Sequence, residues 1–268
     1  MLKNFTSSLI NKDGIWYSEE TSKISYPKEG NEYYFHIENN SFWFKHRNEC
    51  IKAAVNNYPP VDNTIYDVGG GNGFVSKGLS ECGYNTVLVE PGIYGVRNAQ
   101  KRGLENLICS TFQDAKFEES SLGGVGLFDV LEHIEDDVVF LKEIYLSLKK
   151  QGRLYICVPA FMSLWSDEDI EVGHYRRYKL NNLVKKLNSV GFSIDYKTFF
   201  FSFLPVPIFL FRTLPYILGY HRRLISTENQ HTKSASLIDQ IFYPEIGLIK
   251  KKKKILYGGS ILIVAQKR

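Results

Sequence analysis

The sequence TIYDVGGGNG, residues 64–73, decides the fold of this 268-residue chain. It opens with a β-branched and aromatic run, Thr64–Val68, which predicts a short buried strand. Glycines follow at 69, 71 and 73, and glycine lets the backbone turn tightly and come close to a ligand. A helical pattern starts at Gly73, and a helix start presents unpaired N–H groups. A strand, a glycine-rich turn and a helix in this order indicate a nucleoside-binding α/β unit.

Strands and helices alternate along the chain beyond this turn. Such alternation predicts a doubly wound parallel sheet with helices on both faces. We expect strands at 64–68, 85–89, 107–109, 124–128, 153–158, 192–200 and 260–265. We expect helices at 41–57, 73–82, 94–102, 138–149 and 179–190, with Gly152 capping the fourth. Residues 1–40, which contain several breakers, predict loops and short strands.

The glycine spacing discriminates between nucleoside-binding folds. A dinucleotide fingerprint read from Gly69 needs glycine at position 74, where this chain has Phe74. A phosphate-binding Walker loop needs Gly-Lys-Ser/Thr, which the sequence lacks. Glu90 ends the second predicted strand, where a carboxylate accepts hydrogen bonds from ribose hydroxyls. A dinucleotide-dependent oxidoreductase is therefore disfavoured, and a non-catalytic nucleoside-binding or membrane-docking module remains an alternative.

The pattern Asp-x-Gly-x-Gly-x-Gly from Asp67, with an acid after the second strand, resembles the first motif of class I S-adenosylmethionine (SAM)-dependent methyltransferases. Residues 128–136, FDVLEHIED, and 147–159, SLKKQGRLYICVP, resemble later stretches of that family, although Gln151 stands where the family usually has glycine. Residues 159–178, PAFMSLWSDEDIEVGHYRRY, resemble a narrower type 11/23-like subgroup that is often met among bacterial surface-polysaccharide and glycolipid genes. The resemblance covers about residues 35–268.

This resemblance implies a Rossmann-like seven-stranded sheet whose last strand is antiparallel. It also implies methyl transfer from SAM, with S-adenosylhomocysteine (SAH) as product, to oxygen or nitrogen of a small-molecule, sugar or glycolipid acceptor. No metal is expected. The residues that it assigns to the cofactor are Asp67, Gly69, Gly70, Gly71 and Gly73 in the turn, Glu90 at the ribose, Thr111 and Phe112 at the adenine, Phe128 and Asp129 at the sulfonium, and Arg47 or His46 at the carboxylate.

Acceptor-side residues are expected in the segment after the fifth strand. Methyl transfer to a hydroxyl needs a proton acceptor, and histidine is the usual base near neutral pH. His174 is the first candidate for base or orienting group, and His133 the second. Arg176, Arg177 and Tyr178 could hold an anionic acceptor, with Trp43 in a lid over the site; the alternative is that Asp–Arg pairs only brace this loop.

The length exceeds one plain domain and predicts additions to the core. We expect a lid segment at 1–57, the nucleoside-binding core at 58–200, an insertion at 201–257 and the final core strand at 258–268. The insertion is apolar and aromatic at its start and carries a lysine run at 250–254. Segments 198–223 and 250–254 suit contact with an anionic membrane surface, although a buried helix or hairpin is the other reading of the apolar run.

Composition bears on the class of protein, its partners and its location. With 44% hydrophobic and 23% charged residues the chain has the composition of a folded protein. Its formal net charge of +4 rules a nucleic-acid partner neither in nor out, and we expect none. The four cysteines are far apart in sequence, which predicts neither a disulfide frame nor a zinc site. We find no signal-peptide pattern or membrane-spanning run, and expect a cytoplasmic protein that could be peripheral at the inner membrane surface.

Overall fold

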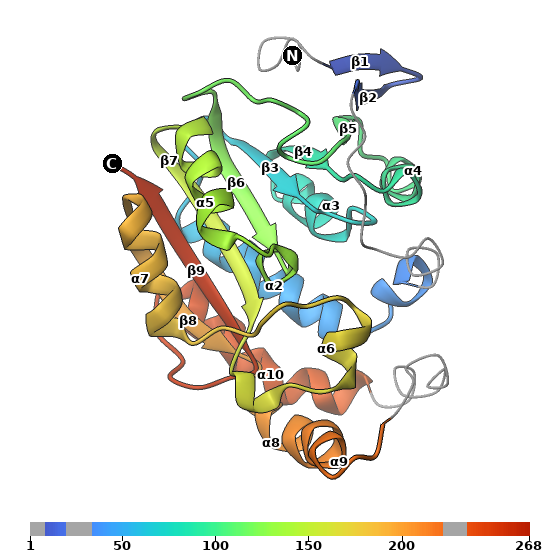
Figure 1. The fold of residues 1–268 in the computed structure, drawn as a ribbon, viewed down its shortest axis with the longest axis vertical. Helices are drawn as coiled ribbons and strands as arrows, with labels where there is room; N and C mark the ends of the chain where they lie inside the picture. The colour runs from blue at the N-terminus through green and yellow to red at the C-terminus, as the bar shows by residue number, and fades with distance from the viewer. Residues whose placement is uncertain (1–8, 20–33, 222–234) are drawn as a thin grey trace.

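A computed structural model of the chain describes residues 9–19, 34–221 and 235–268 (Figure 1). Residues 222–234 of the predicted insertion lie outside these ranges, and so do Arg222 and Arg223 at the end of the segment 198–223 that was expected to touch a membrane. Within them, nine strands form one sheet in the order β1-β2-β5-β4-β3-β6-β7-β9-β8. The strands are β1 (Leu9–Lys12), β2 (Ile15–Ser18), β3 (Thr64–Val68), β4 (Asn85–Val89), β5 (Leu107–Cys109), β6 (Leu122–Phe128), β7 (Leu148–Pro159), β8 (Phe192–Phe200) and β9 (Ser260–Lys267).

The strand directions confirm the predicted Rossmann-like class. Strands β5, β4, β3, β6 and β7 run parallel, and β9 lies antiparallel between β7 and β8. Because the carboxyl ends of the parallel strands share one edge, the turn after β3, Glu90 after β4 and Asp129 after β6 meet there.

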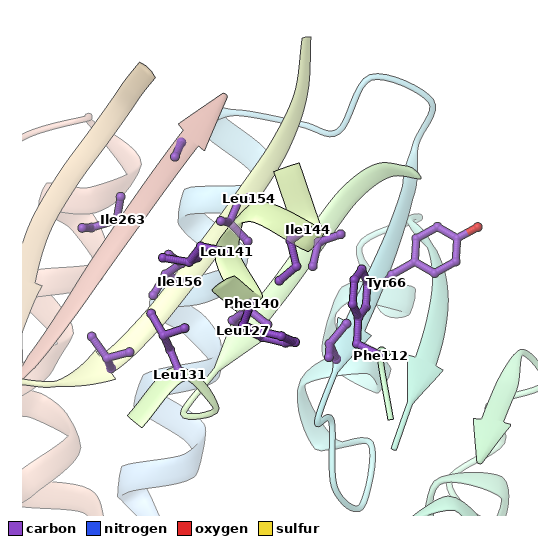
Figure 2. Close-up of a cluster of buried hydrophobic side chains, with 14 of the residues drawn as sticks. Tyr66, Phe112, Leu127, Leu131, Phe140, Leu141, Ile144, Leu154, Ile156 and Ile263 are labelled. Carbon is purple, nitrogen blue, oxygen red and sulfur yellow. The ribbon is translucent and has the colours of Figure 1, made fainter. Parts of the chain in front are cut away.

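Helices cover both faces of this sheet. The long helices are α2 (Phe42–Asn57), α3 (Phe74–Glu81), α4 (Ile93–Lys101), α5 (Asp137–Ser147), α7 (Leu180–Val190) and α10 (Ala235–Lys250). Helices α5 and α7 pack on one face, where Leu187 of α7 is fully buried. Leu141 and Ile144 of α5 are fully buried there too (Figure 2). Helices α2, α3 and α10 pack on the other, and α4 covers the same side over β4 and β5. The core therefore lies in two layers, one on each side of the central strands.

The N-terminal hairpin enlarges the sheet beyond the seven strands expected. Asp13 and Gly14, both with positive φ, form the two-residue turn between β1 and β2. Strand β2 then pairs parallel with β5, from Ile15 opposite Leu107 to Tyr17 opposite Cys109. The short strands predicted in this region are present, but they extend the core sheet and do not belong to a separate lid.

The capping role predicted for Gly152 is wrong. Helix α5 ends at Ser147, and the chain enters β7 at once, pairing Leu148 with Leu122. A register shift follows, with Gln151 at φ +66°. That left-handed conformation favours glycine, which gives a physical reason for the glycine usual at this position in the resembling family.

The insertion joins two apolar pieces. Short helical segments α8 (Pro205–Ile208), η4 (Phe209–Thr213) and α9 (Leu214–Ile217) follow β8, and α10 runs back along α2. Phe242 stacks on Phe42 at the start of α2, whereas Asn57 at its end donates a hydrogen bond to Ile249 O. The lysine run starting at Lys250 therefore begins at the opposite end of α2, about 20 Å from its start.

Candidate cofactor and acceptor site

The glycine-rich turn after β3 leaves backbone exposed toward open space. Gly69 and Gly71 have φ values of +67° and +53°, which disfavour other residues. A Cβ on Gly69 would lie 2.7 Å from Val130 Cγ2, so this glycine allows close packing against the chain after β6. A Cβ on Gly71 would meet no atom within 4 Å. Gly71 is therefore the position at which a ligand can reach the backbone.

Asp67 lies beneath this turn. Its side chain is buried, and its Oδ2 accepts a hydrogen bond of 2.7 Å from Ser76 Oγ in α3. A Cβ on Gly70 would come within 2.8 Å of the same oxygen. Burial raises the pKa of Asp67 to about 6. These contacts favour a role for Asp67 in holding the turn.

Glu90 closes the site from β4. Its Oε2 accepts a hydrogen bond of 3.0 Å from Gly71 N, and its Oε1 accepts one of 2.7 Å from Gly92 N. Each carboxylate oxygen retains a second lone pair for a ligand hydroxyl. Burial raises the pKa of Glu90 to about 7, although these two hydrogen bonds lower it. The geometry fits two ribose hydroxyls next to the Gly71 backbone.

Two glycines let helix α4 approach the turn. A Cβ on Gly73 would lie 2.7 Å from Leu104 Cδ1 and 2.8 Å from Ala99 Cβ, so the need for glycine there comes from packing. A Cβ on Gly95 in α4 would lie 2.8 Å from Gly71 O. Sequence reasoning missed Gly95, because a glycine inside a helix does not by itself indicate what lies opposite it.

The predicted adenine wall is only partly supported. Phe112 is buried in the core, with its ring centroid 5.2 Å from that of Phe117 and 5.8 Å from that of Phe140 (Figure 2). Its ring is thus used by the core and does not stand free beside a ligand. Thr111 remains part-exposed and accepts a hydrogen bond from Asp114 N through its Oγ1. Thr111 therefore stays a candidate for the adenine edge.

Arg47 in α2 reaches across to the end of β6. Its Nε lies 2.7 Å from Asp129 Oδ2, and its Nη2 donates a hydrogen bond of 2.8 Å to Phe128 O. Asp129 itself has φ +59° and lies beside Cys157 of β7, whose Sγ donates to its Oδ1. The structure thus brings together three residues predicted to surround the sulfonium and carboxylate of the cofactor.

His46 does not share that role. It is buried, and its Nε2 lies 2.9 Å from Glu245 Oε2 in α10. Glu245 also accepts hydrogen bonds from Phe201 N and Ser202 N, so the pair anchors the insertion to α2. The His46 alternative for the cofactor carboxylate is therefore corrected in favour of Arg47.

The segment before α2 lies over the glycine-rich turn. Glu38 accepts a hydrogen bond from Asn72 Nδ2 and pairs with Arg102, whose guanidinium lies over the rings of Phe35 and Phe74. The predicted lid residue Trp43 stacks on Phe201, with ring centroids 5.7 Å apart. Trp43 therefore contacts the insertion, and the residues before α2 contact the turn.

A second polar cluster lies beside Asp129. The 3₁₀ turn η2 (Leu131–His133) follows β6, and α6 (Asp167–Glu171) follows β7 and the 3₁₀ turn η3 (Met162–Leu164). His174 Nδ1 lies 2.8 Å from Asp169 Oδ1, and the ring of His174 meets the edge of His133 at 4.7 Å between centroids. Burial lowers the pKa of His133 to about 4.

Glu132, between these groups, was not predicted as a functional residue. Its side chain is fully buried, and burial raises its pKa well above the usual value, with Asp129 adding to the effect. The sequence shows Glu132 within the stretch FDVLEHIED. It does not show that the carboxylate is buried without a hydrogen-bond partner among the described residues.

Arg177 and Tyr178 have structural roles, contrary to the predicted acceptor contacts. The side chain of Arg177 is 8% exposed, and its Nε lies 2.7 Å from Asp169 Oδ1. Tyr178 is in the core, with its hydroxyl 2.9 Å from Asp137 Oδ2. Arg176 is more exposed, yet it also pairs with Asp137, at 3.1 Å. The alternative reading, in which arginine–aspartate pairs brace this loop, fits better.

Comparison with known proteins agrees with this geometry. The sequence profile of the family Methyltransf_11, described as "Methyltransferase domain", matches residues 66–156. This range holds the turn, Glu90, Asp129 and Glu132. The chain contains a class I SAM-dependent methyltransferase domain.

Individual relatives are distant. A ubiquinone biosynthesis O-methyltransferase of Colwellia psychrerythraea is 29% identical over 100 residues, which are 35% of this chain and 41% of that protein. The aligned region thus spans less than half of the curated relative. A SAM-dependent methyltransferase structure from Thermotoga maritima shares the fold, with a TM-score of 0.56, 16% identity and coverage of 90% of this chain and 96% of that one.

A third similar structure carries ligands. It is the geranyl diphosphate C-methyltransferase of Streptomyces coelicolor with Mg²⁺, geranyl diphosphate and SAH, at a TM-score of 0.52 and 15% identity, covering 81% of this chain and 76% of that one. At such identities the likeness shows the fold alone.

The methyltransferase domain confirms the prediction of SAM as cofactor. The residues fit it: the open position at Gly71 admits a ligand against backbone, and Glu90 offers free lone pairs beside it. The profile match ends at residue 156, before His174 and before the insertion. The part of the chain expected to choose the acceptor therefore lies outside the matched region.

Proposed function

We propose that the whole chain is a SAM-dependent methyltransferase whose acceptor is an oxygen or nitrogen of a lipid-linked molecule, such as a glycolipid. The observation that carries the transferase part is the pairing of Gly71, open to a ligand, with Glu90 inside a methyltransferase domain. The lipid part comes from the surface of the insertion. The sugar or other headgroup is the finer part of the proposal, and the resemblance of residues 159–178 supports it.

The residues at the carboxyl edge suit an in-line displacement. SAM supplies an activated methyl group, so the chain's own task is to align the acceptor and accept its proton if it is a hydroxyl. Gly71 and Glu90 would hold the nucleoside, and Arg47 with Asp129 the amino-acid end of the cofactor. The acceptor would then enter beside His174, in the cluster next to Asp129.

The insertion exposes an apolar surface close to this cluster. Phe203, Phe211 and Ile217 are 63%, 67% and 65% exposed. We call these three side chains, together with the exposed apolar side chains that follow, the apolar insertion surface. The further members are Val206, Leu210, Leu214, Leu218 and Tyr220. Large exposed apolar patches are unusual on soluble monomers and mark interaction sites.

Two polar contacts join this surface to the acceptor side of the domain. Arg212 in η4 pairs with Glu168 in α6, and His221 lies 2.7 Å from Asp167 in the same helix. Helix α6 also holds Asp169, the partner of His174. A lipid tail on the apolar insertion surface would therefore place its headgroup toward His174.

Membrane contact in this proposal runs through the insertion alone. No helix in the described ranges is long and apolar enough to cross a bilayer. The lysine run begins at the C-terminal end of α10, with Lys252 over Tyr58 after the end of α2, and this proposal does not use it. The apolar insertion surface would lie in the lipid interface as a shallow anchor.

Vesicle binding tests the surface. We expect the protein to co-sediment with vesicles of phosphatidylglycerol and phosphatidylcholine, and Phe203→Ser/Phe211→Ser/Ile217→Ser to abolish this. The control Val139→Ser/Leu146→Ser removes exposed apolar side chains from α5 and should bind as the wild type does. Equal binding of all three proteins would contradict the proposed surface.

Methyl-labelled SAM tests the acceptor. Incubated with a total cell extract of the source organism, the enzyme should transfer label to molecules that partition into chloroform–methanol. Label found only in water-soluble molecules would refute the lipid-linked acceptor while retaining the methyltransferase. No transfer with either fraction would contradict the transferase itself.

A further inference from the structure

We propose that Glu132, His133 and His174 bind one divalent cation, of the kind that imidazole and carboxylate ligands share, such as Zn²⁺ or Mn²⁺. One ligand atom from each of the three residues lies within 4.8 Å of the other two. Two atoms bound to one tetrahedral ion at about 2.1 Å are about 3.4 Å apart, so closure needs the ligand atoms to approach one another by up to about 1.4 Å.

The carboxylate of Glu132 lacks a partner. The side chain is fully buried, and neither oxygen accepts a hydrogen bond from another residue within the described ranges. A buried carboxylate in that state is costly unless a cation or donor compensates it. The Nε2 of His174 lies 3.9 Å from Oε1 of Glu132, too far for a hydrogen bond.

Neighbouring arginines do not supply that partner. Arg47 pairs with Asp129 at 2.7 Å, and Arg177 pairs with Asp169 at the same distance. Two guanidinium groups thus face three carboxylates in this cluster, counting Glu132. Both guanidinium groups are taken by other carboxylates, so among the described residues Glu132 has no cationic side chain of its own, and a bound cation would fill that place.

His174 is oriented as a metal ligand is. Its Nδ1 lies 2.8 Å from Asp169 Oδ1. When Nδ1–H donates a hydrogen bond to this carboxylate, the lone pair of the ring is on Nε2. That nitrogen is the one facing Glu132. His133, against the ring of His174, offers the second imidazole.

The other cluster of similar composition shows the contrast. His46, Cys50 and Glu245 also lie within 4.8 Å of one another. There the histidine is within hydrogen-bonding distance of the carboxylate, at 2.9 Å, and Glu245 accepts further bonds from Phe201 N and Ser202 N. Every group in that cluster is satisfied without a metal, so only the Glu132 cluster needs one.

Three protein ligands leave coordination positions open beside Asp129. If the chain is the proposed methyltransferase, an acceptor hydroxyl would bind there and lose its proton to water more easily. Its oxygen would then form the bond to the methyl carbon while the carbon–sulfur bond breaks and sulfur keeps the electron pair. His174 would serve as a ligand in place of the base predicted from sequence.

Manganese binding tests this site. The purified chain is treated with EDTA, desalted and titrated with Mn²⁺, and free Mn²⁺ is followed by electron paramagnetic resonance. We expect one bound Mn²⁺ per chain, at least tenfold weaker binding in Glu132→Gln and His174→Ala, and no change in His221→Ala. Glu132→Gln is nearly isosteric, and a retained unfolding temperature shows that it folds.

Competition by Zn²⁺ should release the bound Mn²⁺. Absence of binding by the wild type, or equal binding by the wild type and both cluster variants, would overturn the site. SAH binding measured on the same samples separates the two proposals. A wild type that does not bind SAH would contradict the proposed transferase. A wild type that binds SAH but no metal would contradict only the cation site.

Discussion

Glu90 Oε2 accepts a hydrogen bond of 3.0 Å from the backbone nitrogen of Gly71. This contact joins the end of β4 to the turn after β3 and fixes where a ribose can lie between them. The same buried carboxylate must be ionised to accept hydrogen bonds from the ligand's hydroxyl groups, so it also determines how the cofactor site responds to pH.

SAH binding should strengthen as pH rises from 6 to 8. The pKa of Glu90 is raised to about 7, so the ionised form that accepts ribose hydroxyls is minor at pH 6 and dominant at pH 8. The expected gain in affinity is up to about tenfold. Calorimetric titrations across this range check it, and Glu90→Gln should bind weakly at every pH with a flat profile. Parallel profiles for the two proteins would be evidence against the role of Glu90.

The same carboxyl makes the unliganded protein less stable as pH rises. Its folded-state pKa lies above the ordinary 4.5, so its favourable contribution is fully present below pH 4.5 and is lost as pH rises through about 7. Unfolding by urea at pH 5 and pH 8 should show a larger loss of stability in wild type than in Glu90→Gln. A loss of equal size in both would remove Glu90 from this explanation.

Gly71→Arg should abolish cofactor binding. The new side chain would point into the open space in front of Gly71 and occupy the ligand's place. Gly103→Arg is the matched control, because Gly103 has φ +83° and a Cβ there would also meet no atom within 4 Å. Both variants should lose about 1–2 kcal/mol from the left-handed conformation. Only Gly71→Arg should lose SAH binding, by at least a hundredfold, and similar affinities of the two variants would argue against the site.

Gly95→Ala should weaken both stability and SAH binding. The methyl group would lie 2.8 Å from Gly71 O and push α4 away from the turn. Overpacking of this kind costs about 1–3 kcal/mol. Gly247→Ala is the control in α10, where a Cβ meets no atom within 4 Å, and it should stabilise by about 0.5–1 kcal/mol. Chemical denaturation measures both, and a stabilised Gly95→Ala would show that α4 does not constrain the turn.

The Arg47–Asp129 pair should show strong coupling in a double-mutant cycle. Arg47→Met leaves Asp129 without its cation, and Asp129→Asn leaves a buried guanidinium with a weaker partner. Each single change should cost about 2–4 kcal/mol of unfolding free energy, and the double variant less than their sum. Asparagine tolerates the positive φ of Asp129, so backbone strain does not confuse the comparison. Additive costs would mean that the two charges do not interact.

Much of the fold could be predicted from local sequence patterns. Strands Thr64–Val68, Asn85–Val89 and Phe192–Phe200 were placed at their observed bounds, because buried strands are short β-branched or aromatic runs between clear breakers. Gly152 misled the prediction of where α5 ends. The helix stops where Leu148 begins to pair with Leu122, and strand pairing is a long-range event that local patterns do not encode.

The candidate site divides in the same way. Residues of the turn and Glu90 were found because their chemistry follows directly from motif spacing. Phe112 and Tyr178 were assigned by position near a motif, and their burial in the core could not be read from the sequence. The pairing of Arg177 with Asp169 could not be read from it either. Glu132 and Gly95 were missed because their importance lies in what surrounds them. Glu132 is buried without a hydrogen-bond partner for its carboxylate in the described part of the chain, and a Cβ on Gly95 would lie 2.8 Å from a backbone oxygen.

Calorimetric titration of the wild-type chain with SAH and, separately, with NADH shows which nucleoside the Gly71–Glu90 site binds. We expect one SAH bound per chain and no heat of binding with NADH, because Phe74 stands where a dinucleotide site needs glycine. A chain that binds NADH and ignores SAH would contradict the assignment of the Gly71–Glu90 site to SAM.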